Sequence, residues 1–184
     1  MERQEKLIAQ LKSNAVEAFD RLIERYGDRL YWHIRRVVVQ HEEAEDVLQE
    51  TFTRAYLSIG DFRGETESSL IAWLYKIATT MAIRALHKHK RGIFSSLDSV
   101  RGDLLATFEH EVDPSADEIL VKLQKAILAL PTKQRLVFNM RYYDELSFEQ
   151  ISQATGDSVS TLKTNYHYAV RKIKEQVRVI EIDD

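Results

Sequence analysis

The sequence has no cysteine and is poor in the residues that interrupt helices, with six glycines and two prolines in 184 residues. Without cysteine, neither a disulfide framework nor a thiolate zinc site can form, and a reducing compartment is expected. Because leucine, alanine, glutamate, lysine and arginine are abundant instead, the composition favours helix throughout. The sequence therefore predicts an all-α protein of the cytoplasm.

Long apolar runs are also absent. No stretch approaches the run of about 20 apolar residues that a membrane span needs. Residues 1–12 are charged from the second residue onward, unlike an export signal. We therefore expect no direct membrane insertion.

Recognisable catalytic and metal-binding motifs are missing as well. The chain has no phosphate loop, no nucleophile elbow and no His-Glu-x-x-His pattern. His87 and His89 are separated by one residue, with no carboxylate close in sequence, which does not suit a metal site. The acids between Glu42 and Asp46 are typical of residues that open a helix and face its positive end. We expect no catalytic residue, no cofactor and no metal, and predict that the chain is not an enzyme.

The charge of the chain is unevenly distributed. A formal net charge of -3 is unexpected for a protein that binds nucleic acid unaided, because phosphate contacts require a basic face. From Gly92 to Asp113 five acids face a single arginine, which indicates an acidic linker, with a short helix near 104–108 as an alternative. Just before it lies a basic run that contains no acid: Arg84, His87, Lys88, His89, Lys90 and Arg91.

Apolar residues recur every three or four positions in several segments, which predicts helices. In the first half these segments are 14–39, 42–58 and 70–90. Residues 60–69 have two glycines and no sustained period, so a loop is predicted there, with Ser68 or Ser69 as the cap of the next helix. In the second half, helices are predicted over 114–130 and 132–143, with Pro131 between them. Two of the predicted core-facing sets are Val16, Phe19, Leu22, Ile23, Tyr26, Leu30 and Ile34, and Ile119, Leu120, Leu123, Ile127 and Leu130.

The end of the chain has the pattern of a helix-turn-helix unit. Ser147 and Gln150 have capping-box spacing and introduce a short helix that ends near Gly156, and Ser158 can cap a last helix to about Val177. Short polar groups early on its exposed face suit base edges, and later cations suit phosphates. An ordinary amphipathic surface helix is the alternative. The predicted apolar stripe is Val159, Leu162, Tyr166, Ala169, Val170 and Ile173, and the opposite face holds Ser160, Lys163, Thr164, His167, Arg171 and Lys174.

The basic run in the first half shares a predicted helix with Trp73 and Tyr75. Aromatic rings can stack on unpaired bases while cations neutralise the backbone, so this helix suits single-stranded nucleic acid. A solvated charged helix end is an equally good interpretation of the basic run alone. Trp73 is equally compatible with a core position.

Several segments, in order, resemble the extracytoplasmic-function (ECF) group of RNA polymerase sigma factors. Residues 45–52, Glu-Asp-Val-Leu-Gln-Glu-Thr-Phe, resemble their polymerase-binding helix. Phe62-Arg63-Gly64, followed by residues 73–78, resembles their promoter-melting segment. Leu130-Pro131, residues 135–138, the helix-turn-helix unit and residues 161–164 complete a match that covers nearly the whole chain.

The resemblance implies a transcription initiation factor with two small helical domains joined by a flexible acidic linker, the C-terminal one containing the helix-turn-helix. Residues 1–91 would form the region 2-like domain, 92–113 the linker and 114–184 the region 4-like domain. The implied partners are core RNA polymerase, promoter DNA and an anti-sigma factor. The implied polymerase contacts are Asp46, Gln49, Glu50 and Arg54. The implied minus-ten contacts are Phe62, Arg63, Trp73, Lys76, Thr79, Thr80, Arg84, His87, Lys88 and Arg91, and the implied minus-thirty-five contacts are Ser158, Ser160, Thr161, Lys163, Thr164, His167 and Arg171.

Four positions depart from the usual pattern of the group. Thr80 stands where an asparagine is common and Arg84 where an aspartate is frequent, while Asn165 and Tyr168 replace frequent arginines. We therefore expect unusual promoter preferences. Two other classes of protein remain as alternatives, a dimeric helix-turn-helix repressor or activator and a small helical enzyme. The polymerase-binding and melting patterns in the first half argue against the former, and the lack of an active-site constellation argues against the latter.

Overall fold

The computed structural model describes residues 2–13, 16–88, 105–106, 108, 110 and 117–178. These residues form helices and connecting segments, without a strand among them. The first half contains α1 (Glu2–Lys12), α2 (Val16–Val38), α3 (His41–Ser58), the short 3-10 helix η1 (Ile59–Asp61) and α4 (Glu67–Lys88). The second half contains α6 (Glu118–Leu128), α7 (Thr132–Tyr142), α8 (Phe148–Thr155) and α9 (Val159–Arg178). The all-α prediction is confirmed.

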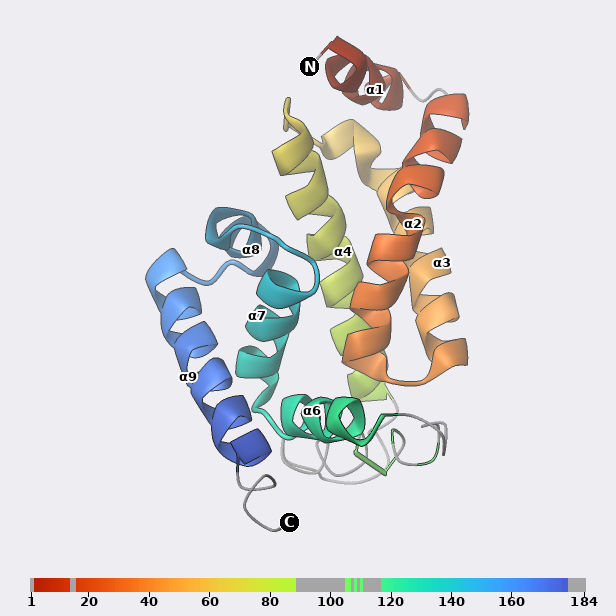
Figure 1. Ribbon diagram of the computed structural model, residues 1–184. Coiled ribbons are helices and arrows are strands. Elements are labelled where there is room, and N and C mark those ends of the chain that lie inside the picture. The colour runs from red at the N-terminus through yellow and green to blue at the C-terminus, as the bar shows by residue number, and fades with distance from the viewer. Residues whose placement is uncertain are drawn as a thin grey trace.

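Helices α2, α3 and α4 form one bundle, and α1 lies across its end (Figure 1). Helix α2 buries one face along its length, including Phe19, Leu22, Leu30 and Ile34. The prediction that Val16 and Ile23 share this face is wrong, because their side chains are 62% and 41% exposed. Val16 is at the first turn of α2, where no neighbouring helix covers it.

Helix α1 was not among the predicted elements. Leu7, Ile8 and Leu11 are buried, and the helix packs against α2, α4 and η1. Its apolar residues, Leu7, Ile8, Ala9 and Leu11, fall within five positions, a stretch too short to establish a helical period. Tertiary packing of a short amphipathic face stabilises such a helix more than local propensity does.

The start of α4 differs from the prediction. Ser68 and Ser69 lie within the helix, and the residue before its first turn is Thr66. The Ser69 N–H donates to the Thr66 hydroxyl and the Thr66 N–H donates to the Ser69 hydroxyl, both at 3.2 Å. This reciprocal pair satisfies backbone donors at the helix end as a capping box does.

The helix-turn-helix prediction is confirmed in detail. Ser147 accepts a hydrogen bond from the Gln150 N–H, and the Gln150 side chain accepts one from the Ser147 N–H. Gly156 ends α8 with a φ of 81°, a left-handed conformation that glycine adopts without a Cβ penalty. The Ser158 hydroxyl accepts from the Thr161 N–H at 3.2 Å at the start of α9. On α6, however, Ile119 and Leu120 are 68% and 59% exposed, so their predicted core position is wrong.

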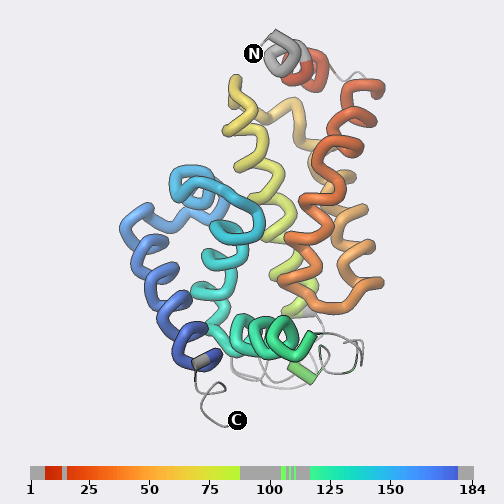
Figure 2. The backbone as a smooth tube through the Cα atoms, viewed as in Figure 1, coloured from red at the N-terminus to blue at the C-terminus, as the bar shows by residue number. Residues whose placement is uncertain are grey.

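The two halves pack against each other (Figures 1 and 2). Helix α8 packs along α4, and α7 contacts α2. One cluster of buried side chains includes Leu74 and Ala78 of α4 together with Ile151 of α8 and Leu162 of α9. A second cluster joins α6, α7 and α9. The two predicted domains therefore share a core in this arrangement, and most of the predicted linker, with the alternative short helix near 104–108, lies outside the described residues.

Candidate nucleic-acid and polymerase surfaces

Every residue predicted to contact the minus-thirty-five element is exposed, six of them on α9 and Ser158 just before it. Leu162, Ala169 and Ile173 are buried beneath the exposed face of α9, as the apolar stripe predicts. The Lys163 Nζ lies 5.8 Å from the centre of the Phe148 ring, and Arg171 pairs with Glu175 at 3.6 Å. The exposed face therefore has hydroxyls near its start and cations along its length: Ser158, Ser160, Thr161, Lys163, Thr164, His167 and Arg171.

The loop before α4 is organised around Phe62. Phe62 is 5% exposed, and its ring lies 5.1 Å from the half-buried Trp73 ring at an interplanar angle of 40°. A Cβ on Gly64 would lie in very close contact with the Phe62 ring and the Ser69 hydroxyl, so a side chain here would require these groups to shift. Arg63 is exposed and donates to the Gly60 carbonyl at 2.8 Å. In this arrangement Arg63, rather than Phe62, faces outward.

Helix α4 presents the predicted minus-ten residues to different environments. Lys76, Arg84 and His87 are exposed, and Thr80 is half-buried, with its hydroxyl donating to the Lys76 carbonyl at 2.7 Å. Thr79 is 5% exposed and its hydroxyl lies 2.9 Å from the His33 Nε2. The Lys88 side chain and Arg91 lie outside the described residues. The exposed basic face of the described part of α4 is therefore smaller than the predicted one.

The four predicted polymerase contacts lie on the exposed side of α3. Asp46, Gln49, Glu50 and Arg54 are all exposed, and Arg54 pairs with Glu50 at 2.9 Å. The opposite side, which includes Val47, Thr51, Phe52 and Ala55, is buried against the bundle. The amphipathic pattern of this helix therefore predicted correctly which side is buried and which is exposed.

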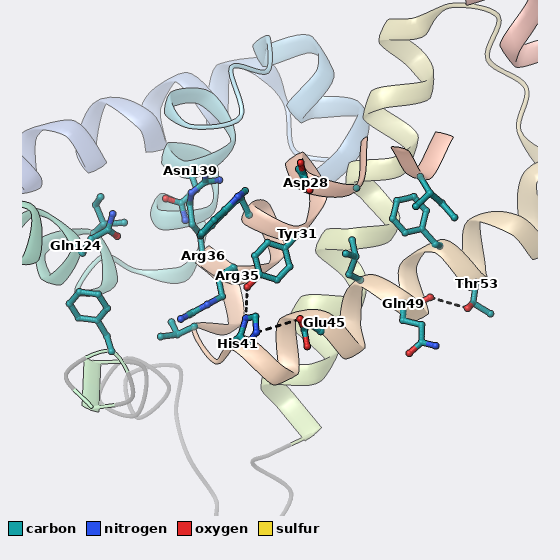
Figure 3. Close-up of a pocket in the computed structure, with 18 of the residues that line it drawn as sticks. Asp28, Tyr31, Arg35, Arg36, His41, Glu45, Gln49, Thr53, Gln124 and Asn139 are labelled. Atoms are coloured by element: carbon teal, nitrogen blue, oxygen red, sulfur yellow. Dashed lines mark hydrogen bonds and ion pairs between the residues drawn. The ribbon is translucent and has the colours of Figure 1, made fainter. Parts of the chain in front are cut away.

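A large apolar groove, which the sequence did not predict, runs between the two halves beside this surface. Its volume is about 1370 Å³, and α2, α3, α6 and α7 all contribute to its walls. Figure 3 shows Gln49 and Glu45 of α3 at its edge, with Tyr31 bonded to His41. The Tyr31 hydroxyl is 2.6 Å from the His41 Nδ1, and Glu45 is 3.4 Å from the His41 Nε2. Six of the 21 residues that line it have aromatic side chains: Phe19, Tyr31, Trp32, Phe52, Tyr56 and Phe108.

Asp144 lies where the two halves meet, and no feature of the sequence predicted a role for it. Its carboxylate is 2.7 Å from the His33 Nδ1 and 2.8 Å from an Arg36 nitrogen. The Asp144 backbone carbonyl accepts from Arg29 at 2.9 Å. Since these partners are more than a hundred positions away in sequence, no local pattern could reveal the contact.

Burial shifts the pKa values of several groups, of which two connect helices. Burial, with a hydrogen bond to Glu67 as a smaller cause, raises the pKa of Tyr26 to about 12. Burial lowers the pKa of Arg135 to about 10. Arg135 is 3% exposed and donates to the Leu128 carbonyl at 3.5 Å, which joins α7 to the end of α6. Both residues connect helices and lie away from the exposed face of α9.

Neither a metal cluster nor a membrane span is found in the described part of the chain. Residues 2–13, 16–88 and 117–178 bring no three His, Asp or Glu side chains into a metal-binding group. Within the same ranges no helix has both the length and the apolar character to cross a bilayer.

Comparisons with known proteins identify the family. Residues 22–92 match the model of Sigma-70 region 2, and residues 120–173 match that of Sigma-70, region 4. The chain is 31% identical to the ECF RNA polymerase sigma factor SigW of Bacillus subtilis, over 94% of this chain and 96% of SigW. It is 28% identical to the RNA polymerase sigma-H factor of Pseudomonas aeruginosa, over 96% and 95% of the two chains.

Solved structures share the fold. CnrH, solved in complex with the cytosolic domain of CnrY, aligns with a TM-score of 0.69 and 22% identity, over 98% of this chain and 99% of CnrH. The sigma factor RpoE of Bartonella quintana, solved with the anti-sigma factor NepR, aligns with a TM-score of 0.65 and 18% identity, over 88% and 97%. With two sigma regions in order and a relative that matches over almost its full length, this chain belongs to the ECF group of RNA polymerase sigma factors, which are transcription initiation factors.

Proposed function

We propose that this sigma factor binds core RNA polymerase through α3 and reads promoter DNA through α4 and α9. The observation that carries the proposal is the polar and basic face of α9, which is exposed on a helix that follows a left-handed glycine turn. Such a helix can place its N-terminal turn in the major groove, where side chains reach base edges. The hydroxyls of Ser160 and Thr164 suit bases, and Lys163 and Arg171 suit phosphates.

The polymerase surface consists of Asp46, Gln49, Glu50 and Arg54 of α3. These residues would contact the clamp helices of core polymerase, as the sigma family implies. The minus-ten element would be recognised by the loop over 61–69 and the exposed residues of α4, including Arg63, Lys76, Arg84 and His87. We assign these roles to residues 1–91, the minus-thirty-five contact to residues 114–184, and the connection near the polymerase RNA path to residues 92–113.

Because the chain has a negative net charge, it would need core polymerase in order to bind promoter DNA. With a net charge of -3, the protein has little attraction for duplex DNA on its own. Core polymerase would fix both DNA-reading surfaces at promoter spacing, so that two weak contacts act together through effective concentration. The protein would work in the cytoplasm, would not be an enzyme and would need no cofactor.

Transcription with purified core polymerase tests this proposal. Adding the chain should start RNA synthesis at specific sites, and mapping those sites would reveal the promoter. The variant Asp46→Ala should reduce polymerase binding, whereas Asp20→Ala, at an exposed position of α2, should not. No start site above the background of core polymerase would contradict the proposed function.

An anti-sigma protein is proposed as a second partner. Support comes from the two structural relatives, one solved with CnrY and the other with the anti-sigma factor NepR. Such a protein would cover the polymerase and DNA surfaces until a signal releases it. Affinity capture from native cytoplasm and membranes should recover it beside polymerase, and recovery of polymerase alone would contradict this part of the proposal.

A further inference from the structure

Asp144, at the end of α7, binds three residues of α2. Its side chain is 3% exposed and accepts hydrogen bonds from the His33 Nδ1 at 2.7 Å and from Arg36 at 2.8 Å. Arg29 donates to its backbone carbonyl at 2.9 Å. Residues 29, 33 and 36 lie on one face of a helix, four and three positions apart, so a single aspartate contacts two turns of α2.

His33 connects this contact to α4. It is fully buried, its Nε2 lies 2.9 Å from the Thr79 hydroxyl, and its ring packs edge-on against Tyr75 at 4.8 Å between centroids. We use the term Asp144 network for Asp144, Arg29, His33, Arg36 and Thr79. The network joins α2, α4 and the end of α7, and it is a polar contact that holds α7 on the first half.

The network consists largely of charged groups, which suits an interface whose two sides can separate. Burying charged groups costs free energy, and their mutual attraction offsets that cost only while each keeps its partners. When the halves separate, water can solvate the same groups, so the network fixes one arrangement without making it permanent. The network is the polar part of an interface that also contains the apolar cluster of Leu74, Ala78, Ile151 and Leu162.

The observed arrangement cannot read a promoter. Helix α8 contacts both α4 and α9, so the two DNA-reading helices are two helix spacings apart, about 20 Å. The minus-ten and minus-thirty-five elements are separated by about 25 base pairs, roughly 85 Å at about 3.4 Å per base pair. This step rests on the proposed function. The halves must separate before both elements are bound.

We infer that Asp144 holds the free sigma factor in a closed conformation and that core polymerase must break its contacts with α2 to assemble the promoter-reading form. The closed conformation reduces the apparent affinity for polymerase by the fraction of molecules that are open. Loss of the aspartate charge therefore opens the chain and strengthens polymerase binding.

The absence of cysteine allows a direct test. Spin labels on Glu24→Cys of α2 and Gln176→Cys of α9, both exposed positions, report the distance between the halves in the full chain. We expect one short distance for the otherwise wild-type chain and a shift to longer, broader distances with Asp144→Asn. The open-to-closed ratio should rise at least about tenfold. Asp157→Asn is the matched control, since it removes an ion pair to Lys133 within the second half, and should leave the distance unchanged.

Arg36→Gln provides a second variant, because Arg36 is partly exposed and its loss leaves the core intact. It should reproduce the shift even if Asp144→Asn fails to fold, as judged by circular dichroism. Unchanged distances in the folded variants would overturn the inference. So would a shift in distance without tighter binding to core polymerase. A failure of the proposed function is recognised separately, because the wild-type chain would then start no transcription, whereas the distances are measured without polymerase or DNA.

Discussion

Lys163 is exposed on the second turn of α9, in the row of polar residues assigned to the minus-thirty-five element. Replacing it with alanine should lower transcription from promoters that depend on this element by about tenfold, since one base or phosphate contact contributes roughly 1 to 3 kcal/mol. Lys122→Ala on α6, where the lysine pairs with Glu118 at 3.7 Å, is the control and should have little effect. If Lys163→Ala and Lys122→Ala lowered transcription from the mapped start sites equally, Lys163 would make no specific contact.

Gly64 is required by close packing in the loop before α4. Alanine would bring its Cβ into very close contact with the Phe62 ring, which packs against Trp73 and would have to shift. We expect Gly64→Ala to reduce the free energy of unfolding by about 1 to 3 kcal/mol in denaturant titrations. At Gly60 a Cβ meets no atom within 4 Å, so Gly60→Ala should be close to neutral. Equal free energies of unfolding for the two variants would contradict this prediction, because they would mean that the groups around Gly64 shift without loss of stability.

At the scale of the element, the turn between α8 and α9 fixes where the recognition helix begins. Gly156 has a φ of 81° and open space around it, so the penalty for a side chain comes from the backbone alone. Gly156→Ala should destabilise by about 1 to 2 kcal/mol. Gly27→Ala within α2 should instead stabilise by roughly 0.5 to 1 kcal/mol, because it removes glycine from a helix interior. Thermal unfolding of the two variants should move in opposite directions.

Glu67 connects α2 to the start of α4 by accepting from Tyr26 at 2.9 Å and pairing with Arg25. Because the pKa of Tyr26 is raised from 10 to about 12, the folded state retains a proton that the unfolded state loses in this range. Stability should therefore fall as pH rises from 10 through about 12, by roughly 2 to 3 kcal/mol from this group.

Tyr26→Phe should flatten this alkaline loss in unfolding titrations, although Tyr75 contributes a loss of the same sign because burial raises its pKa too. Tyr142→Phe, at a side chain that is 57% exposed, is the control and should leave the slope unchanged. An identical pH dependence in wild type and Tyr26→Phe would show that the pKa of Tyr26 is the same in the folded and unfolded states.

At the scale of the whole molecule, neither DNA-reading surface is expected to suffice alone. The chain is mildly acidic, and its two basic surfaces are too close together to span a promoter in the closed conformation. Purified chain should bind promoter DNA with a Kd in the non-specific range, about 10⁻⁴ to 10⁻⁶ M, and should lose affinity steeply with added salt. A fluorescence titration that found tight, sequence-specific binding without polymerase would contradict this expectation.

The helices and their faces followed from sequence because they depend on neighbours three or four positions away. The apolar stripe of α9, the Ser147 and Gln150 capping box and the Gly156 turn are local features, and each predicted an element that the structure contains. The exposure of the four residues of α3 that we propose bind polymerase followed from the same periodicity. The sequence did not predict helix α1, because the stability of this helix comes from tertiary contacts rather than from its own pattern.

Tertiary structure alone decided what covers each face. Phe62 and Thr79 lie in segments assigned to DNA, yet Phe62 packs into the loop core and Thr79 is buried and bonds to His33 of α2. Asp144 became a contact only because α7 docks on a helix 108 to 115 positions earlier in the chain. Local sequence fixes the period of a helix, but burial and charge pairing depend on which distant surface meets it, and that is settled by the packing of the two halves.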